Sequence, residues 1–175
     1  MNYGYGNYGA SGFLAAFFAI YVVVLGSILV LALVVYVLNG FAFMALFRKV
    51  GIEPWAAWVP YFNIWRILEL GGQPGWISLV AFVPQVGGIV SVVFECIATY
   101  RISHAFRKGG EWVVLFIFLP FVWAWLLASD KETYEPGLFA QHGWSQPLVG
   151  HGSARGPYTP STYPAPPAPP APPAA

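Results

Sequence analysis

The chain has 175 residues, of which 58% are hydrophobic and only 9% are charged, against about 25% charged residues in an average soluble domain. Its 8 Trp, 10 Tyr and 14 Phe outnumber its 8 Lys and Arg and 7 Asp and Glu, a balance that excludes an ordinary water-soluble domain and predicts an integral membrane protein. The formal net charge is +1 and the sequence has no block of basic residues, which argues against nucleic acid as a partner. The single cysteine, Cys96, excludes an intrachain disulfide.

The N-terminal region divides into a short tail and a long apolar run. Residues 1–12, MNYGYGNYGASG, cannot bury a core and predict a flexible tail. The apolar run over residues 13–38 is longer than the roughly 20 residues that cross a bilayer, and residues 41–47 extend it into the interface. Because it lacks a basic leading region and a small-residue cleavage site, we expect a retained transmembrane helix over about 13–47 rather than a secretion signal.

Three further apolar segments follow, at about 55–70, 76–100 and 112–128. The last is short but sufficient for one crossing. The first is ambiguous, because Pro60, Arg66 and Glu69 interrupt it. It either crosses with its charged end at the headgroups or lies along the interface. Together with the first helix, these segments predict an all-α integral membrane domain over 13–135, a helical bundle of about four hydrophobic segments.

Basic residues set the expected orientation, because Lys and Arg in short loops stay on the cytoplasmic side. One basic loop contains Arg48 and Lys49, and the other contains Arg101, Arg107 and Lys108. Both loops belong on the same side, which four crossings with both chain ends outside would satisfy. The alternative keeps 55–70 in the interface and turns 76–100 into a re-entrant hairpin, with two full crossings. Either arrangement predicts a multi-pass membrane protein.

A tryptophan followed by a proline recurs in each of these three segments. The pairs are Trp55 with Pro60, Trp76 with Pro84 and Trp112 with Pro120. Tryptophan anchors at the membrane interface, and a proline eight residues further along a helix lies about 12 Å deeper, where it removes a backbone hydrogen bond. We therefore expect three Pro-broken helices anchored by the tryptophans. The prolines should face protein or a wet cavity, since lipid does not tolerate unpaired backbone groups.

The order of the short motifs along the chain resembles that of a known protein family. Along the chain stand Gly51-x-x-Pro54-Trp55, Pro60-Tyr61-Phe62-Asn63, Gly72-x-Pro74-Gly75-Trp76, Pro84, Ala105-Phe106-Arg107-Lys108-Gly109, Phe118-Leu119-Pro120-Phe121, Ser129-Asp130 and Tyr134. Over about residues 41–137, this order resembles a family of small bacterial integral-membrane proteins of unknown function. That family has Gly-x-Pro-Gly-Trp, Ile-Pro-x-Tyr-Asn and Phe-Gly-Lys-Gly motifs and is sometimes fused ahead of a signal-peptidase-like domain. The resemblance implies a multi-span module of the bacterial inner membrane and implies no reaction.

Glu95 is the most informative single residue, because it lies inside an apolar run between Phe94 and Cys96. A charged side chain at helix-centre depth costs about 2.5 to 3.5 kcal/mol, so this carboxylate should be paired, protonated or facing water. One hypothesis is an ion or proton relay, with Arg66 as its counter-charge and Asn63 on the same helix face as Arg66. The other, which we favour, is a helix-end carboxylate that reaches the headgroups or holds helices together.

No spacing of residues indicates a catalytic, metal or cofactor site. His104, His142 and His151 do not form a zinc-binding pattern, and Cys96 has no histidine near it in sequence. The sequence contains no glycine-rich phosphate loop followed by Lys-Ser or Lys-Thr. We therefore predict that the protein is not an enzyme and holds no cofactor.

Residues 136–175 form the predicted disordered tail, which ends in PAPPAPPAPPAA, a sequence typical of polyproline II. Its Pro-x-x-Pro steps are either a docking segment for a tail-binding protein or, as we favour, a plain spacer. The whole sequence predicts a non-enzymatic accessory or scaffold subunit, which packs in the lipid bilayer against another membrane protein or against itself. The alternative is a small oligomeric channel or transporter that uses Glu95 and the Pro-broken helices.

Overall fold

The computed structural model describes residues 6–151, and every regular element among them is helical, which confirms the predicted all-α class. The elements in chain order are α1 (Gly6–Val50), the 3-10 helix η1 (Pro54–Trp58), α2 (Phe62–Leu70), the 3-10 helix η2 (Gly75–Phe82), α3 (Gly87–Ala105), α4 (Glu111–Phe118), α5 (Pro120–Ala128) and α6 (Gly137–Gln141). The polyproline sequence predicted as a spacer lies outside the described residues.

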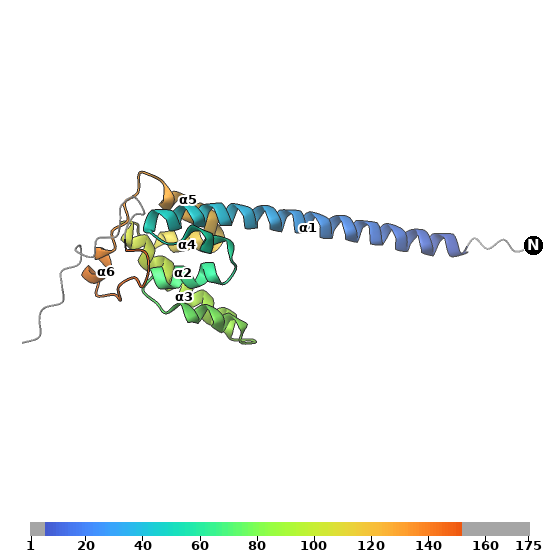
Figure 1. Ribbon diagram of the computed structural model, residues 1–175. Helices are drawn as coiled ribbons and strands as arrows, with labels where there is room; N and C mark the ends of the chain where they lie inside the picture. Colours follow the sequence, from blue (N-terminus) through green and yellow to red (C-terminus); the bar gives the residue numbers. More distant parts are fainter. Residues whose placement is uncertain (1–5, 152–175) are drawn as a thin grey trace, which may run out of the picture.

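Helix α1 is uninterrupted, and its first half stands apart from the rest of the molecule (Figure 1). It has no proline and no charged residue before Arg48, so nothing in its sequence ends it early. Residues 12–36 are exposed, whereas most side chains from residue 40 onward pack into the body of the protein. The helix begins at Gly6, within the stretch 1–12 that the sequence predicts to be a tail.

Each of the three remaining apolar segments folds as two helical pieces joined at a proline. Pro60 lies in the turn between η1 and α2, Pro84 lies in the turn between η2 and α3, and Pro120 is the first residue of α5. Because proline has no backbone N–H and its ring clashes with the preceding turn, a helix that arrives at such a position stops or bends. Left-handed backbone at Tyr61 (φ 62°) and Gln85 (φ 69°) completes the first two reversals.

The two ends of each of the first two segments return to the same face of the protein. Arg66 of α2 lies 3.5 Å from Glu53, which comes just before η1. Arg101 of α3 donates a hydrogen bond of 3.3 Å to the carbonyl of Gly71, which comes before η2. Each segment therefore forms a hairpin that begins and ends on one face, with its turn at the far end (Figure 1).

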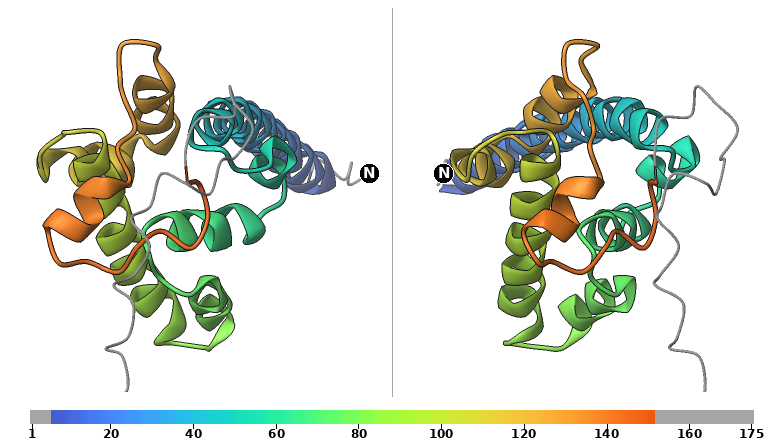
Figure 2. Two further views of the ribbon diagram at one scale, coloured as in Figure 1. Left: turned by 60° about the vertical axis from the view of Figure 1, so that its left-hand side comes forward. Right: turned by 90° about the vertical axis from the view of Figure 1, so that its left-hand side faces the viewer.

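The third segment closes in the same way. Lys108, before α4, pairs with Glu132, after α5, at 2.8 Å, and Arg107 pairs with Glu135 at 2.9 Å. Lys49, near the end of α1, donates to a carbonyl at the end of α5 at 2.9 Å. Helices α5 and η1 pack directly against the second half of α1, while α2 and α3 lie farther out (Figure 2).

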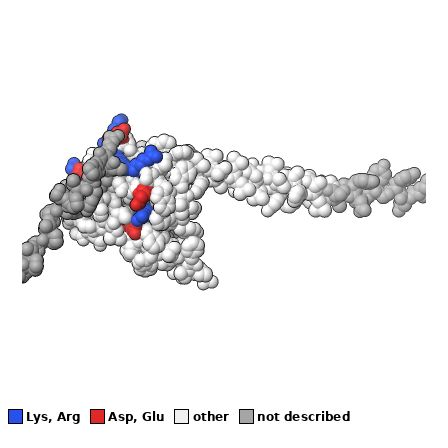
Figure 3. Space-filling view, viewed as in Figure 1, with Lys and Arg blue, Asp and Glu red and all other residues white. Residues whose placement is uncertain are grey.

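Charged side chains gather where the hairpins begin and end, and we call this surface the charged face (Figure 3). Its residues are Arg48, Lys49, Glu53, Arg66, Glu69, Arg101, Arg107, Lys108, Glu132 and Glu135. Among residues 6–151, α1 is the one helix long and apolar enough to cross a membrane, so the predicted bundle of four crossings is not confirmed. The proline turns are the reason, since they divide each later segment into two short pieces.

The core lies between the second half of α1 and the hairpins. Trp123 of α5 is fully buried, with its ring centroid 6.3 Å from that of Phe43 on α1 and 5.2 Å from that of Phe116 on α4. Its indole N–H donates to the hydroxyl of Ser103 on α3 at 3.1 Å. A single side chain thereby joins four helices, which holds the second and third hairpins against α1.

The folded part extends beyond the predicted boundary at residue 135. Helix α6 buries Phe139 completely, and the N–H of Leu148 donates to the carbonyl of Glu69 at 2.8 Å. Residues 137–150 therefore lie over the ends of the hairpins, where Phe139 is buried and Leu148 stays exposed. These residues are the first part of the stretch 136–175 that the sequence predicts to be a tail, and residues 152–175 of it lie outside the described residues.

The second hairpin depends on a glycine where its two arms meet. A Cβ at Gly87 would overlap the carbonyl oxygen of Val80 on the opposite arm. We expect Gly87→Ala to lower the free energy of unfolding by about 1 to 3 kcal/mol, the usual cost of overpacking, as measured by denaturant titration in detergent micelles. Gly88→Ala is the matched control, since nothing lies within 4 Å of its Cβ position. Equal losses in the two variants would show that this close approach does not stabilise the hairpin.

Candidate functional site

A cavity of about 460 Å³ lies where the second half of α1 faces the three hairpins, and it opens to the surface at Pro60 and Tyr61, which are exposed. Its walls are mainly apolar and include Phe43 and Phe116. Three polar side chains line it, each from a different helix: Asn39 of α1, Asn63 of α2 and Glu95 of α3. A cavity of this size with apolar walls and a few polar groups is typical of small-molecule sites.

Glu95 lies on a short polar track along α3. The hydroxyl of Ser91, one turn earlier, donates a hydrogen bond of 2.9 Å to the Glu95 carboxylate. The hydroxyl of Thr99, one turn later, donates to the Glu95 backbone carbonyl at 2.8 Å. Both hydroxyl residues are buried. No lysine or arginine among the described residues lines the cavity, so the carboxylate faces it without a basic residue beside it.

The two asparagines add hydrogen-bond acceptors to this cavity. The side-chain oxygen of Asn63 is buried and has no hydrogen-bond partner within the described part of the chain. Asn39 donates from its amide nitrogen to the carbonyl of Val35 at 2.9 Å, which leaves its side-chain oxygen as an acceptor. With the Glu95 carboxylate, the cavity offers acceptor oxygens from three helices.

Two of the three predicted helix breaks also lie at the cavity. Pro60 and Pro120 line it, whereas Pro84 lies in the exposed turn of the second hairpin. A proline leaves a carbonyl of the preceding turn without its usual N–H donor. The cavity at Pro60 and Pro120 provides the surrounding other than lipid that such unpaired carbonyl groups need within a membrane.

Arg66 lies outside the cavity. It forms an ion pair with Glu69 at 2.8 Å and a second with Glu53 at 3.5 Å, and its guanidinium lies 4.9 Å from the ring centre of Phe62. One hypothesis from the sequence made Arg66 the counter-charge of Glu95, and the structure does not pair these two residues. Because α2 runs toward the charged face, Arg66 lies closer to that face than Asn63 does, and it pairs there with Glu53 and Glu69.

The three predicted anchor tryptophans stand near the charged face, where each hairpin begins. Trp55 stacks on Phe62 with ring centroids 5.1 Å apart. The ammonium of Lys108 lies 5.1 Å from the ring centre of Trp112. Trp76 directly follows the glycine that begins η2, and it is exposed. A tryptophan near the start of each hairpin is where an interface anchor is expected.

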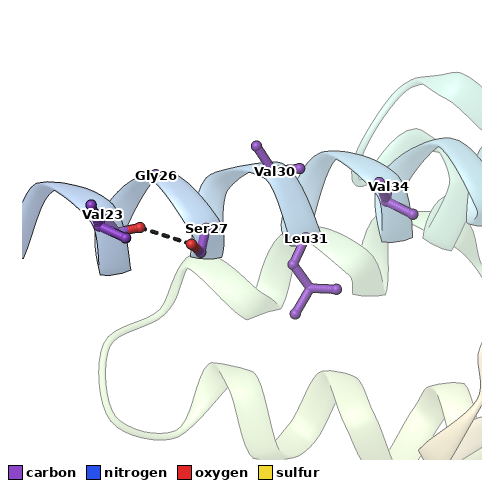
Figure 4. Close-up of a pocket in the computed structure, with 6 residues that line it drawn as sticks. All are labelled: Val23, Gly26, Ser27, Val30, Leu31 and Val34. Atoms are coloured by element: carbon purple, nitrogen blue, oxygen red, sulfur yellow. Dashed lines mark hydrogen bonds between the residues drawn. The ribbon is translucent and has the colours of Figure 1, made fainter.

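A second hollow lies on the first half of α1. This shallow groove, of about 550 Å³, is lined by Val23, Gly26, Ser27, Val30, Leu31 and Val34, all from the one helix (Figure 4). The Ser27 hydroxyl donates to the carbonyl of Val23 at 2.8 Å, so its polar group is satisfied within the helix. Nothing lies within 4 Å of a Cβ position at Gly26. The groove is therefore an open, apolar notch.

Sequence reasoning missed Asn39 as a site residue. Its only signal is that a lone amide interrupts the charge-free run of α1. Ser27 is a second polar residue in that run, yet it bonds to its own helix and lies far from the cavity lining. Local sequence does not distinguish the two positions, and only the packing of the hairpins against α1 does.

The comparison with known proteins agrees with the resemblance to a family of unknown function. Residues 55–136 match DUF5684, which is described as a family of unknown function. No curated protein and no solved structure matches the chain. The matched region contains the three hairpins, Asn63 and Glu95, and it excludes α1 with Asn39.

Proposed function

We propose that the chain is a non-enzymatic protein of the bacterial inner membrane, which crosses the bilayer once through α1 and inserts its three hairpins into the cytoplasmic half. The charged face supports this orientation, because its Lys and Arg belong on the cytoplasmic side. The hairpin surfaces support insertion, since Trp76, Ile89 and Phe118 are 58, 70 and 77% exposed. Large apolar surfaces of this kind are rare on soluble monomers.

The dimensions of the hairpins support insertion to about half the bilayer depth. The arms from Trp76 to Pro84 and from Trp112 to Pro120 span about 12 to 16 Å, at about 1.5 Å per residue in an α-helix and about 2.0 Å in a 3-10 helix. The hydrocarbon core is roughly 30 Å thick. The turns would therefore lie near its middle, where irregular backbone is tolerated only beside protein or a cavity.

Helix α1 is too long for this bilayer. Its charge-free stretch from Phe13 to Phe47 measures about 52 Å at about 1.5 Å per residue, whereas the hydrocarbon core is roughly 30 Å thick. A tilt of about 40°, the upper end of the usual range, shortens its projection to about 40 Å. Roughly 10 Å of apolar helix therefore needs to be covered by something other than the bilayer core.

We infer that an apolar helix of another membrane protein covers this excess length, which makes the chain an accessory or scaffold subunit. The single observation that carries this inference is the exposure of residues 12–36 along the whole first half of α1. The groove at Gly26 supports it, because a residue without a side chain lets a partner helix approach the backbone closely.

Photo-crosslinking in native membranes tests this role. Benzoylphenylalanine at Phe17 or Ile28, both exposed on α1, is expected to give a discrete protein adduct, whereas the same group at Val93 on α3 is not. Gly26→Leu fills the groove and is expected to reduce adduct formation at Ile28 at least threefold, because it blocks close helix approach. The fold should be unchanged, since nothing lies within 4 Å of that Cβ position.

Gly88→Leu is the control for this experiment, because Gly88 is equally open but lies on α3. It is expected to leave the crosslinking yield unchanged. An adduct between two differently tagged copies would identify a homo-oligomer in place of another protein. Only lipid adducts at Phe17 and Ile28, with no effect of Gly26→Leu, would contradict lateral packing through α1.

The second candidate function is a small oligomeric carrier or channel. The observation that favours it is the cavity where Asn39, Asn63 and Glu95 meet beside two helix breaks. Polar groups at broken helices are the usual substrate sites of transporters. Several copies would be needed for a pathway, because residues 6–151 contain one helix long enough to span the bilayer. Equal flux by wild type and Glu95→Gln in liposomes would remove Glu95 from such a mechanism.

A further inference from the structure

The cavity between α1 and the hairpins has a chemistry that lateral packing through α1 does not use. Glu95 is the one charged residue among the described residues that line it, and the hydroxyl of Ser91 donates to one oxygen of that carboxylate. Asn63 presents a buried side-chain oxygen without a hydrogen-bond partner in the described range. Arg66, the nearest basic residue along α2, is engaged by Glu53 and Glu69. The cavity therefore holds one carboxylate and the amide oxygens of two asparagines, with no basic residue of the described chain to balance the negative charge.

The depth of the cavity makes this imbalance important. At about 1.5 Å per residue, Asn39 lies about 14 Å along α1 from Arg48 on the charged face, and Glu95 lies about 9 Å along α3 from Arg101 on the same face. In the orientation proposed above, both depths are inside a hydrocarbon core of roughly 30 Å. A carboxylate at such a depth is stable only if a proton, water or a cation compensates its charge. A cationic ligand would provide that compensation.

The walls of the cavity favour an organic cation over a metal ion. Four aromatic side chains line it, from Tyr36, Phe43, Tyr61 and Phe116, and aromatic faces attract organic cations. The volume of about 460 Å³ lies within the range of small-molecule pockets. Within residues 6–151, no group of three or more His, Cys, Asp and Glu side chains could hold a metal ion.

We propose that this cavity is a binding site for a lipophilic organic cation. The carboxylate of Glu95 holds the positive charge, the oxygens of Asn39 and Asn63 stabilise it from the opposite helices, and the aromatic rings contact the apolar body of the ligand. Binding here goes beyond the scaffold role and does not depend on how the first half of α1 packs.

Tetraphenylphosphonium is the test probe, with tetraphenylborate as a control ion of nearly the same shape and opposite charge. The full chain is reconstituted in phosphatidylcholine nanodiscs, and the uptake of empty nanodiscs is subtracted from the total. We expect saturable binding of about one cation per chain and no saturable binding of the anion. A second lipophilic cation, tetrapropylammonium, is expected to displace the probe. Absence of a saturable component for tetraphenylphosphonium would overturn the proposal.

Variants then test whether the cavity holds the cation. Glu95→Gln is expected to weaken binding at least tenfold, and Glu95→Asp to retain most of it. Glu111→Gln, which removes an exposed carboxylate that does not line the cavity, is expected to bind as wild type does. Asn63→Leu keeps the charge and removes the buried acceptor, so it provides a second test if Glu95→Gln does not fold. Unchanged affinity in a folded Glu95→Gln variant would place the cation elsewhere and reject the site.

Different experiments would contradict the proposed scaffold role and the proposed cation site. Loss of crosslinking in Gly26→Leu concerns the first half of α1 and leaves cation binding unchanged. Loss of cation binding in Glu95→Gln concerns the cavity and leaves the crosslinks at Phe17 and Ile28 unchanged. A variant that lost both would indicate general unfolding, and tryptophan fluorescence in the same nanodiscs detects that state.

Discussion

A cysteine introduced at Pro74 is expected to react with a membrane-impermeant maleimide from the same side of the membrane as a cysteine at Lys131. A cysteine at Ser11, in the first turns of α1, is expected to react from the opposite side. Pro74 is exposed in the loop between the first and second hairpins, which the hydrogen bond from Arg101 to Gly71 holds near the charged face. Each cysteine is expected to be labelled almost entirely from one side of the membrane.

Labelling is measured in spheroplasts and in inverted vesicles from a bacterial host. The background is Cys96→Ala, because Cys96 is the one free cysteine and is partly exposed. Labelling of each variant after detergent solubilisation controls for buried or misfolded positions. Four crossings instead place Pro74, Lys131 and Ser11 all on one side, so labelling of Ser11 from the same side as Pro74 would overturn the hairpin arrangement.

Trp123→Ala is expected to lower the free energy of unfolding in micelles by about 3 to 5 kcal/mol, the usual cost of removing a buried tryptophan. Trp123 is fully buried and contacts Phe43 and Phe116, so its loss leaves a cavity shared by α1, α4 and α5. The hydroxyl of Ser103 also loses its indole donor. Denaturant titration followed by circular dichroism measures the change without relying on the removed fluorophore.

Trp123→Phe separates the packing from the hydrogen bond. It keeps an aromatic ring in the core but removes the donor to Ser103, so we expect a loss of about 1 to 2 kcal/mol. Trp125→Ala is the surface control, because that side chain is 56% exposed on the same helix. If Trp125→Ala were as destabilising as Trp123→Ala, the position of the core would differ from the one described.

The helical class and the places where helices break follow from the sequence, because both are local properties. A proline lacks its N–H donor whatever surrounds it, so Pro60, Pro84 and Pro120 interrupt helices in any fold of this chain. The charge-free run that ends at Arg48 likewise predicts one long apolar helix, and α1 is that helix. The start of the C-terminal tail was not predictable in this way, because Phe139 is buried only by contact with distant segments.

The tertiary structure alone decided whether a broken segment returns to its starting face. Crossing segments and hairpins contain the same apolar residues, and the distinction here lies in pairs such as Glu53 with Arg66 and Lys108 with Glu132. The candidate site likewise arises from contacts between residues that are distant in the sequence. The interruption of apolar runs by polar side chains is visible in the sequence, whereas the meeting of those side chains in one cavity depends on how three helices pack. Hydrophobicity sets how far a segment enters an apolar medium, but contacts between distant residues set which side chains face each other there.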